Sequence, residues 1–345
     1  MDRAPPEVWL RISSYACTDA GITGRSLSLV SKFIRAASAR VKLQSIAAHG
    51  PQQIYALDDL LRRTPPHLRL VKYLYISLAP PSSFPHGLGE SGRPSLPVGE
   101  SRQVNKTRAM RLAQVAEKKQ LVAACCRILQ MVSESIEILY LDGRGSLNFG
   151  DSAPIVFPRL EELVSNDLPI SNDRDAMPTL ALFPRLHHWH LMTYPRRSKP
   201  DVFTAISTLA PIITHLRFSD LQQEAYFPSY LKVALDITNS QQSPSVVPMV
   251  GFHHLVSHIG RLPSSIESVY VKPAAPPAPG GMCGTPHTSY AHLIVGLEVL
   301  RKLDSRIVPL PSYNNHLEPR CALSEWEGRI NGGDGCWSLP ERIEN

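Results

Sequence analysis

A short hydrophobic pattern recurs along the chain from residue 71 onward. Each copy has an apolar residue, two variable positions, and then an apolar, a variable and an apolar position. The copies are VKYLYIS (71–77), IEILYLD (136–142), LEELVSN (160–166), LHHWHLM (186–192), ITHLRFS (213–219) and IESVYVK (266–272), and the third has Ser165 in its last apolar slot. Because apolar residues at every second position are typical of β-strands, each copy predicts one strand.

The spacing of these strands indicates a repeat fold. The fourth-position residues are Leu74, Leu139, Leu163, Trp189, Leu216 and Val269, and from Leu139 on they are 24, 26, 27 and 53 residues apart. A period of about 20–29 residues with an L-x-x-L-x-L strand is typical of leucine-rich repeats, and 53 residues is about two such periods. Amphipathic helical stretches are expected at 53–62, 108–133, 201–209, 251–260 and 289–303. Alternating strands and helices predict an α/β fold, an irregular leucine-rich-repeat-like solenoid with a parallel sheet.

The first 50 residues follow a helical pattern instead. Pro5 and Pro6 fit the start of a helix, where a missing N–H costs little. Apolar residues then recur at helical spacing over 6–17 and, after a turn, over 25–41. A helical module of roughly 45 residues buries little apolar area by itself. We therefore expect its remaining apolar face to need a partner.

Residues 4–48 resemble an F-box domain, closest to the versions seen in basidiomycete fungi. The resemblance rests on PPEVWLRISSYACTD followed by RSLSLVSKFIRAAS, and GGDGCW near the C-terminus also resembles the ends of those fungal proteins. The residues that match the family pattern are Pro5, Glu7, Val8, Leu10, Ile12, Val30, Ser31 and Lys32. The chain departs from the pattern at Ala4, Ser13 and Ile34, where the family usually has leucine, phenylalanine and an aromatic residue. Each departure is expected to remove apolar contact area and to reduce affinity for the partner.

The resemblance implies a three-helix module that docks on the Skp adaptor of an SCF-type ubiquitin ligase, and through it on a cullin. The adaptor-binding residues that it implies are Pro5, Pro6, Val8, Leu10, Ile12, Leu29, Val30, Phe33 and Ile34. The chain would then be a substrate-recognition subunit that captures a protein on its repeats, without a cofactor or catalytic activity of its own. A helical cap on the repeats would explain the periodicity equally well, but not the Pro-x-Glu and Val-Ser-Lys matches.

The alternation within the strands predicts which side chains face a target protein. Positions four and six point into the core, so positions three, five and seven are expected to face outward. Position five forms a column of Tyr75, Tyr140, Val164, His190, Arg217 and Tyr270. Tyrosine, histidine and arginine suit a protein-binding surface, so the five residues other than Val164 are our candidate substrate-binding residues. Equally, these side chains could simply fill an exposed sheet, as tyrosine does well in strands.

Composition supports a folded chain with several parts. Hydrophobic residues make up 43% of the 345 residues, which is enough for a buried core, and 31 prolines favour short elements separated by turns. We divide the chain into an F-box domain (4–48), the first helix and strand of the repeat domain (50–78), a flexible Pro/Gly/Ser-rich insertion (79–105), the degenerate repeat domain (106–305) and a C-terminal tail (306–345).

The net charge of +6 raises a second hypothesis. Residues 92–119 carry seven Lys/Arg against two acidic residues, so the chain could be a non-catalytic repeat scaffold or a nucleic-acid-binding protein that uses this segment. No aromatic residues are interleaved with these charges, which favours a solvated linker running into an amphipathic helix.

Other functions find less support in the sequence. It shows neither a nucleophile motif nor paired metal-ligand motifs, so we nominate no catalytic residue and no metal site. The N-terminus lacks an apolar signal segment, the six cysteines are scattered, and no stretch is apolar enough to span a bilayer. We expect a cytoplasmic or nuclear protein that acts without a membrane.

Overall fold

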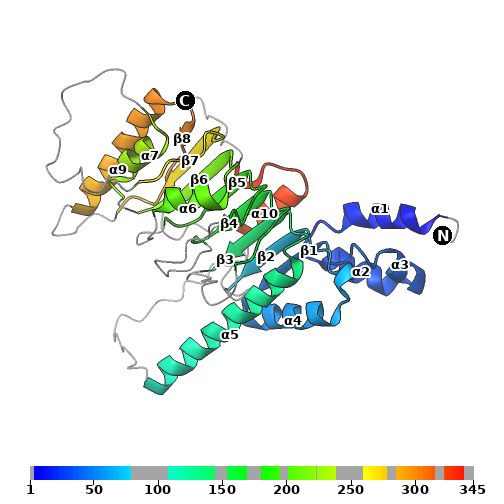
Figure 1. The fold of residues 1–345 in the computed structure, drawn as a ribbon. Coiled ribbons are helices and arrows are strands. Elements are labelled where there is room, and N and C mark those ends of the chain that lie inside the picture. The colour runs from blue at the N-terminus through cyan, green and yellow to red at the C-terminus, as the bar shows by residue number, and fades with distance from the viewer. Residues whose placement is uncertain are drawn as a thin grey trace, which may run out of the picture.

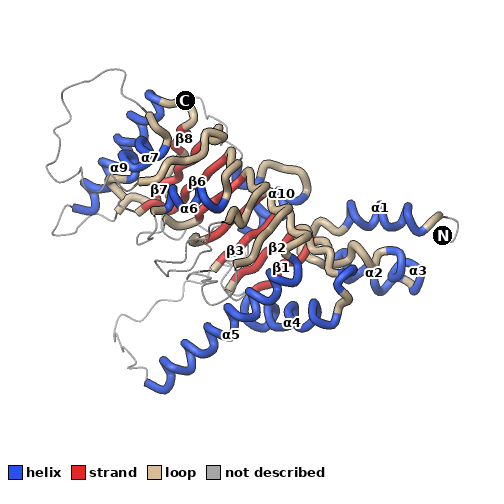
Figure 2. Tube along the Cα trace, viewed as in Figure 1, coloured by secondary structure: helices blue, strands red, loops and turns tan. Residues whose placement is uncertain are grey.

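The computed structural model describes residues 4–78, 108–143, 154–168, 180–194, 201–222, 224–237, 259–277, 285–314 and 322–337. The fold is α/β and is built on a parallel sheet in which each strand pairs with the next one along the chain (Figures 1 and 2). Among the described residues the sheet has eight strands: β1 (Ser45–His49), β2 (Tyr73–Ser77), β3 (Ile138–Asp142), β4 (Glu162–Ser165), β5 (His188–Leu191), β6 (His215–Leu221), β7 (Ser268–Pro273) and β8 (Ile307–Pro309).

Helices lie on both sides of this sheet and beyond one of its ends. One face is covered by α4 (Gly50–Arg63), α5 (Arg108–Val132), α6 (Val202–Leu209), α7 (Phe227–Ala234) and α9 (Thr285–Leu303), and a 3-10 turn η1 (Pro66–Leu68) follows α4 (Figure 1). The opposite face is covered by α10 (Ala322–Ile330) and the 3-10 turn η3 (Gly335–Trp337). Three short helices lie beyond β1, namely α1 (Pro6–Ala16), α2 (Ile22–Val30) and α3 (Lys32–Ala37).

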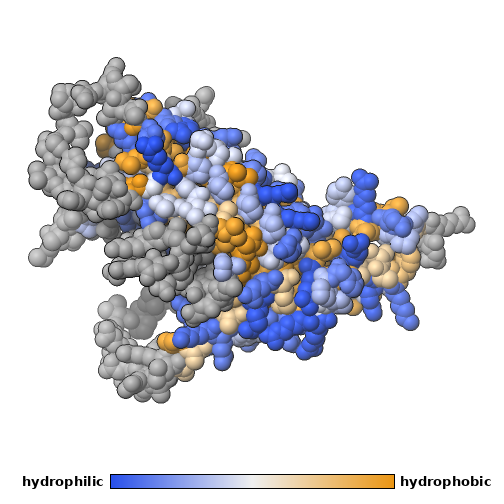
Figure 3. Space-filling view, in the orientation of Figure 1, coloured by the Kyte–Doolittle hydropathy of each residue, from blue (hydrophilic) through white to orange (hydrophobic). Residues whose placement is uncertain are grey.

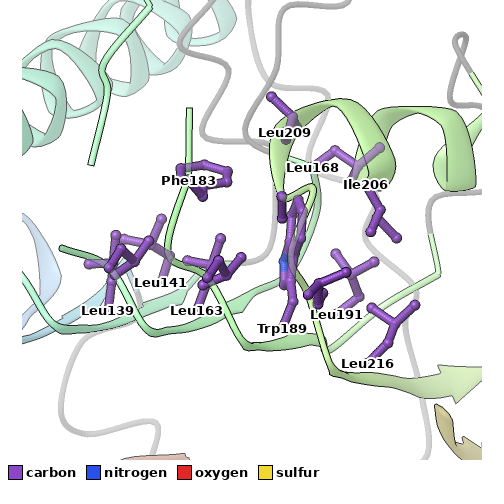
Figure 4. Close-up of a cluster of buried hydrophobic side chains, with 14 of the residues drawn as sticks. Leu139, Leu141, Leu163, Leu168, Phe183, Trp189, Leu191, Ile206, Leu209 and Leu216 are labelled. Atoms are coloured by element: carbon purple, nitrogen blue, oxygen red, sulfur yellow. The ribbon is translucent and has the colours of Figure 1, made fainter. Parts of the chain in front are cut away.

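The six predicted strands are confirmed, together with their register. The fourth-position residues pair across the sheet in the order Leu74, Leu139, Leu163, Trp189, Leu216 and Val269, and all six are buried. Figure 4 shows several of these side chains on the side of the sheet where α6 lies. The irregular Ser165 is also buried there, and its Oγ accepts a hydrogen bond from Trp189 Nε1 at 3.2 Å. The serine therefore satisfies the one polar group of its large apolar neighbour.

The helix-covered face forms a continuous apolar core. The contributing side chains include Ile54 and Leu61 from α4, Ile128 from α5, Phe203 from α6 and Phe227 from α7. Burying such a side chain stabilises the fold by about 1.5–3 kcal/mol, so this face supplies most of the hydrophobic stabilisation.

Among the described residues, β1, β8, α7 and α10 were not predicted. The strand β1 lies partly inside the range 4–48 assigned to the N-terminal module, and β8 lies inside the predicted tail. The sequence SIAAH of β1 is weak in β-branched residues, β8 has three residues, and α7 follows β6 closely. The helix expected over 251–260 falls almost entirely outside the described residues, and so does the whole insertion at 79–105.

Candidate protein-docking surfaces

The three N-terminal helices are shaped by local hydrogen bonds. Helix α1 has Pro6 as its first residue and Glu7 in its first turn, where a negative charge is favourable. The Asp19 carboxylate accepts hydrogen bonds from the backbone N–H groups of Gly21 and Thr23, both at 2.9 Å, and so fixes the start of α2. Ser31 then separates α2 from α3, because its backbone is extended and its Oγ accepts from Ile34 N at 3.1 Å. The helical stretch predicted over 25–41 therefore contains two helices.

These helices leave an apolar face uncovered. Leu29 is 75% exposed and Val30 is 66% exposed. Figure 3 shows apolar side chains at the surface of this part of the molecule. The other exposed apolar residues of α1–α3 are Pro6, Val8, Ile12, Tyr15, Ile22 and Phe33, and Pro5 is exposed just before them, whereas Leu10 is partly buried. We call the exposed set of Val8, Ile12, Leu29, Val30 and Phe33 the N-terminal apolar face.

One of the predicted adaptor-binding residues is buried in the free chain. Ile34 is only 7% exposed, because α3 directs this side chain into the small core between the helices. Ser13 is buried as well, at 2% exposed. Both departures from the family pattern thus change the packing inside the module, and they do not reduce its exposed apolar face.

The N-terminal helices are joined firmly to the first strand. Gln44 Nε2 donates a hydrogen bond to the carbonyl oxygen of Ser14 at 2.9 Å, and the Ser45 hydroxyl donates to the carbonyl oxygen of Asp19. Gly24 of α2 lies against the backbone before β1, where a Cβ would come within 2.1 Å of the carbonyl oxygen of Lys42. No larger residue fits at this position without moving the helix or the strand.

The predicted column of strand residues exists, but it is not exposed. Tyr75, Tyr140, Val164, His190, Arg217 and Tyr270 are cross-strand neighbours in that order, on the face opposite the helix-covered core. All six are buried, with exposed fractions from 0% at Tyr75 to 9% at Tyr270. The expectation that this column is open to a target is therefore wrong. Its five candidate substrate-binding residues lie under residues 322–337, which we call the C-terminal segment.

The C-terminal segment covers the column with two tryptophans. Helix α10 buries Ala322, Trp326 and Ile330, which are four residues apart and so share one face of the helix. The Trp326 ring packs on Tyr75 with ring centroids 5.8 Å apart. Further along the sheet, the Trp337 ring lies 5.1 Å from His188 and 5.8 Å from Tyr270.

Charged groups anchor the same segment. The Tyr140 hydroxyl donates to Glu162 Oε1 at 3.1 Å, and Arg329 Nε donates to Glu162 Oε2 at 2.5 Å. Burial raises the pKa of Glu325 of α10, while the positive charges of Arg217 and Lys272 act in the opposite direction. Helix α10 is thus anchored by the ion pair of Arg329 with Glu162, and the positive charges of Arg217 and Lys272 act on its Glu325.

The C-terminal segment also reaches the N-terminal helices. Asn331, just after α10, donates from Nδ2 to the carbonyl oxygen of Thr18 at 3.2 Å, and Thr18 Oγ1 donates to Asn331 Oδ1 at 2.8 Å. Thr18 lies in the loop between α1 and α2. The segment therefore connects the sheet to the N-terminal module.

Sequence reasoning missed the role of Glu162 and of α10. Glu162 occupies position three of its strand and was not singled out, although its side chain is only 1% exposed. The signal for α10 was present in ALSEWEGRI, where Ala, Trp and Ile recur at intervals of four. Such spacing predicts an amphipathic helix but does not say which surface it covers.

The described ranges also bear on metal binding, on membrane spanning and on the basic segment. There, no group of three His, Cys, Asp or Glu side chains could hold a metal ion. In the same parts of the chain, no helix combines the length and the apolar character needed to cross a membrane. In the described part of 92–119, the side chains of Lys118 and Lys119 are exposed beside Glu117.

Comparison with known proteins does not identify the chain. It matches no protein-family model, no curated protein and no solved structure at a significant level. The resemblance to the F-box family therefore rests on the sequence alone, and the function that it implies is a proposal.

Proposed function

We propose that the protein is a substrate-recognition subunit of an SCF-type ubiquitin ligase. The observation that carries this proposal is the N-terminal apolar face, which belongs to the residues that resemble an F-box. Large exposed apolar side chains that gather on one small module are typical of a protein–protein interface. In this proposal α1–α3 are an F-box module that docks the Skp adaptor and thereby a cullin, and the strands and helices from β1 onward are a leucine-rich-repeat-like solenoid.

The position of the module suits this role. The three helices lie beyond β1 at one end of the sheet, so a partner on their apolar face need not displace any part of the main core (Figure 1). The contacts of Gln44 and Gly24 hold the module against the sheet, which keeps a bound adaptor at a fixed place relative to the repeats. A receptor acts by raising the effective concentration of its target near the conjugating enzyme, and a fixed geometry supports that effect.

Val30→Asp tests adaptor docking. Val30 is 66% exposed in the free protein, so the substitution should leave the fold intact. On docking, the carboxylate would be buried without a partner, which should cost about 3 kcal/mol or roughly 100-fold in affinity. The measurement is binding of the purified chain to a purified Skp adaptor, with circular dichroism to check the fold.

Val299→Asp is the matched control. Val299 lies on α9, at the other end of the sheet, and is 51% exposed, so it receives the same charge in a comparable setting. We expect this variant to bind the adaptor with the affinity of the unaltered chain. Equal binding by Val30→Asp and the unaltered chain, with both folded, would show that the N-terminal apolar face does not dock the adaptor.

A further inference from the structure

The two faces of the sheet carry different kinds of residue. At the positions that face the helices, the six repeat strands have only uncharged side chains, all apolar except Ser165. Under the C-terminal segment, the sheet carries Glu162 and Arg217, which are 1% and 8% exposed. Charged groups are costly in a permanently closed core, whereas they are well solvated on a face that is open part of the time. We call the face under the C-terminal segment the covered face. Its charged residues are typical of a binding surface.

The fit between this face and its cover is incomplete. The indole N–H groups of Trp326 and Trp337 are buried, and neither has an acceptor within the described residues. A buried donor without an acceptor opposes burial, so each indole lowers the net stability of the covered state. The C-terminal segment therefore docks on the sheet less stably than its buried area alone would suggest.

The C-terminal segment is also short. Helix α10 has nine residues and buries three side chains. A helix of this length is not stable alone in water, so its folding and its docking on the sheet are a single step. The segment can leave the face without disturbing the apolar core, because its side chains belong to separate clusters.

We propose that the face formed by Tyr75, Tyr140, Glu162 and Arg217 is a helix-binding site, and that α10 occupies it in the free protein. Its partner is a target helix with the chemistry of α10: an acidic residue, a large aromatic residue directly after it, and an arginine three residues further on. The identity of this partner as a ubiquitination target rests on the proposed function. Helix binding itself needs neither the adaptor nor the ligase.

The contacts of α10 define what the site recognises. The aromatic residue takes the place of Trp326 on the Tyr75 ring. The arginine takes the place of Arg329 and pairs with Glu162, and the acidic residue takes the place of Glu325 opposite Arg217 and Lys272. A helix with its two charges exchanged would place like charges on Glu162 and Arg217, so the site also discriminates against that arrangement.

A labelled peptide of residues 322–337 tests the site directly. The full chain with Trp326→Ala keeps the sheet but holds its own segment weakly, whereas the unaltered chain keeps its site filled by an intramolecular competitor. We expect fluorescence anisotropy, under reducing conditions, to show the peptide binding at least tenfold more tightly to Trp326→Ala than to the unaltered chain. Equal or absent binding to a folded Trp326→Ala chain would overturn the proposal.

A charge exchange shows whether binding uses the same contacts. The peptide with Arg329→Glu should bind the Trp326→Ala chain at least tenfold more weakly than the unaltered peptide. Adding Glu162→Lys to that chain should reverse the preference, because the lysine then faces the glutamate of the altered peptide. If neither Arg329→Glu in the peptide nor Glu162→Lys in the chain alters the affinity, the peptide binds elsewhere, and this would also overturn the proposal.

Hydrogen exchange on the unaltered chain gives a test that needs no variant. The amides of α10 should exchange at least tenfold faster than those of β3, because the segment opens while the sheet stays folded. If α10 and β3 exchange together, the segment opens only on global unfolding and is not a displaceable occupant. These measurements contain no adaptor, so their failure is distinct from a failure of Val30→Asp to weaken adaptor binding.

Discussion

One face of the parallel sheet meets α4, α5, α6, α7 and α9 through apolar side chains, and the other meets the C-terminal segment through tyrosines, histidines and charged groups. Both faces are buried, and each buries large aromatic side chains, but the polar groups of those side chains differ in whether they have a hydrogen-bond partner. On the helix-covered face, the indole of Trp189 donates to Ser165 Oγ, whereas the indole of Trp326 on the other face lacks an acceptor in the described part of the chain. Burial alone therefore does not distinguish a core from a covered binding surface.

The two faces therefore differ in the interactions that stabilise them. The helix-covered face is stabilised mainly by hydrophobic burial between the sheet and its helices. The covered face adds the Arg329–Glu162 ion pair and the stack of His188 on His215, with ring centroids 4.6 Å apart. Its stability should respond to charge and to pH, and variants on the two faces should separate these contributions.

The largest expected effect comes from Trp189→Ala on the helix-covered face. Trp189 is completely buried in the main core, next to the Phe183 ring at 5.7 Å. Its removal should leave a cavity and lower the free energy of unfolding by about 3–5 kcal/mol. In urea unfolding followed by circular dichroism, the midpoint should fall while the slope m stays unchanged, because the surface exposed on unfolding is the same.

A smaller effect is expected from Trp326→Ala on the covered face. Trp326 is also fully buried, but the loss cannot exceed the free energy with which the C-terminal segment docks, about 2–3 kcal/mol. Once the segment is released, less surface remains to be exposed on unfolding, so the slope m should fall as well. A loss as large as that of Trp189→Ala, with m unchanged, would show that the segment is an integral part of the core.

The two faces also show how much of the fold could be predicted from the sequence. Alternation in the strands gives the face to which each side chain points, so the register of Leu74 with Leu139 and of Tyr75 with Tyr140 was predictable. Alternation says nothing about what covers a face. The burial of Tyr75 depends on Trp326, which lies 251 residues later in the sequence and reaches β2 only in the folded chain.

The N-terminal module shows the same limit at a smaller scale. Helical spacing predicted two helical stretches, over 6–17 and 25–41, but not the Ser31 N-cap that divides the second stretch into α2 and α3. Spacing could not decide whether Val30 or Ile34 faces inward, since both lie on the apolar side of the pattern. The structure separates them, with Val30 exposed and Ile34 buried, because the two residues belong to different helices.

The smallest expected effect is a dependence of stability on pH that comes from the covered face. Burial lowers the pKa of His188 from 6.5 to about 4, and the nearby positive charges of His215 and Arg329 act in the same direction. Between pH 6.5 and 4 the unfolded chain therefore binds a proton that the folded chain does not, so the free energy of unfolding falls as the pH falls through this window. His188 is partly exposed, which reduces the expected loss to about 1–2 kcal/mol.

His188→Gln isolates this contribution from that of the carboxylates, which also titrate at acidic pH. Its free energy of unfolding, measured by urea titration at pH 7 and at pH 4.5, should fall by about 1 kcal/mol less between the two pH values than that of the unaltered chain. The exposed His67 on the helix-covered side provides the control, since His67→Gln removes a histidine without touching the C-terminal segment. If His188→Gln and His67→Gln change the pH dependence equally, the histidines beneath Trp337 do not make the covered face sensitive to acid. A difference between them would locate the acid sensitivity at the face that α10 and η3 cover, and not in the apolar core.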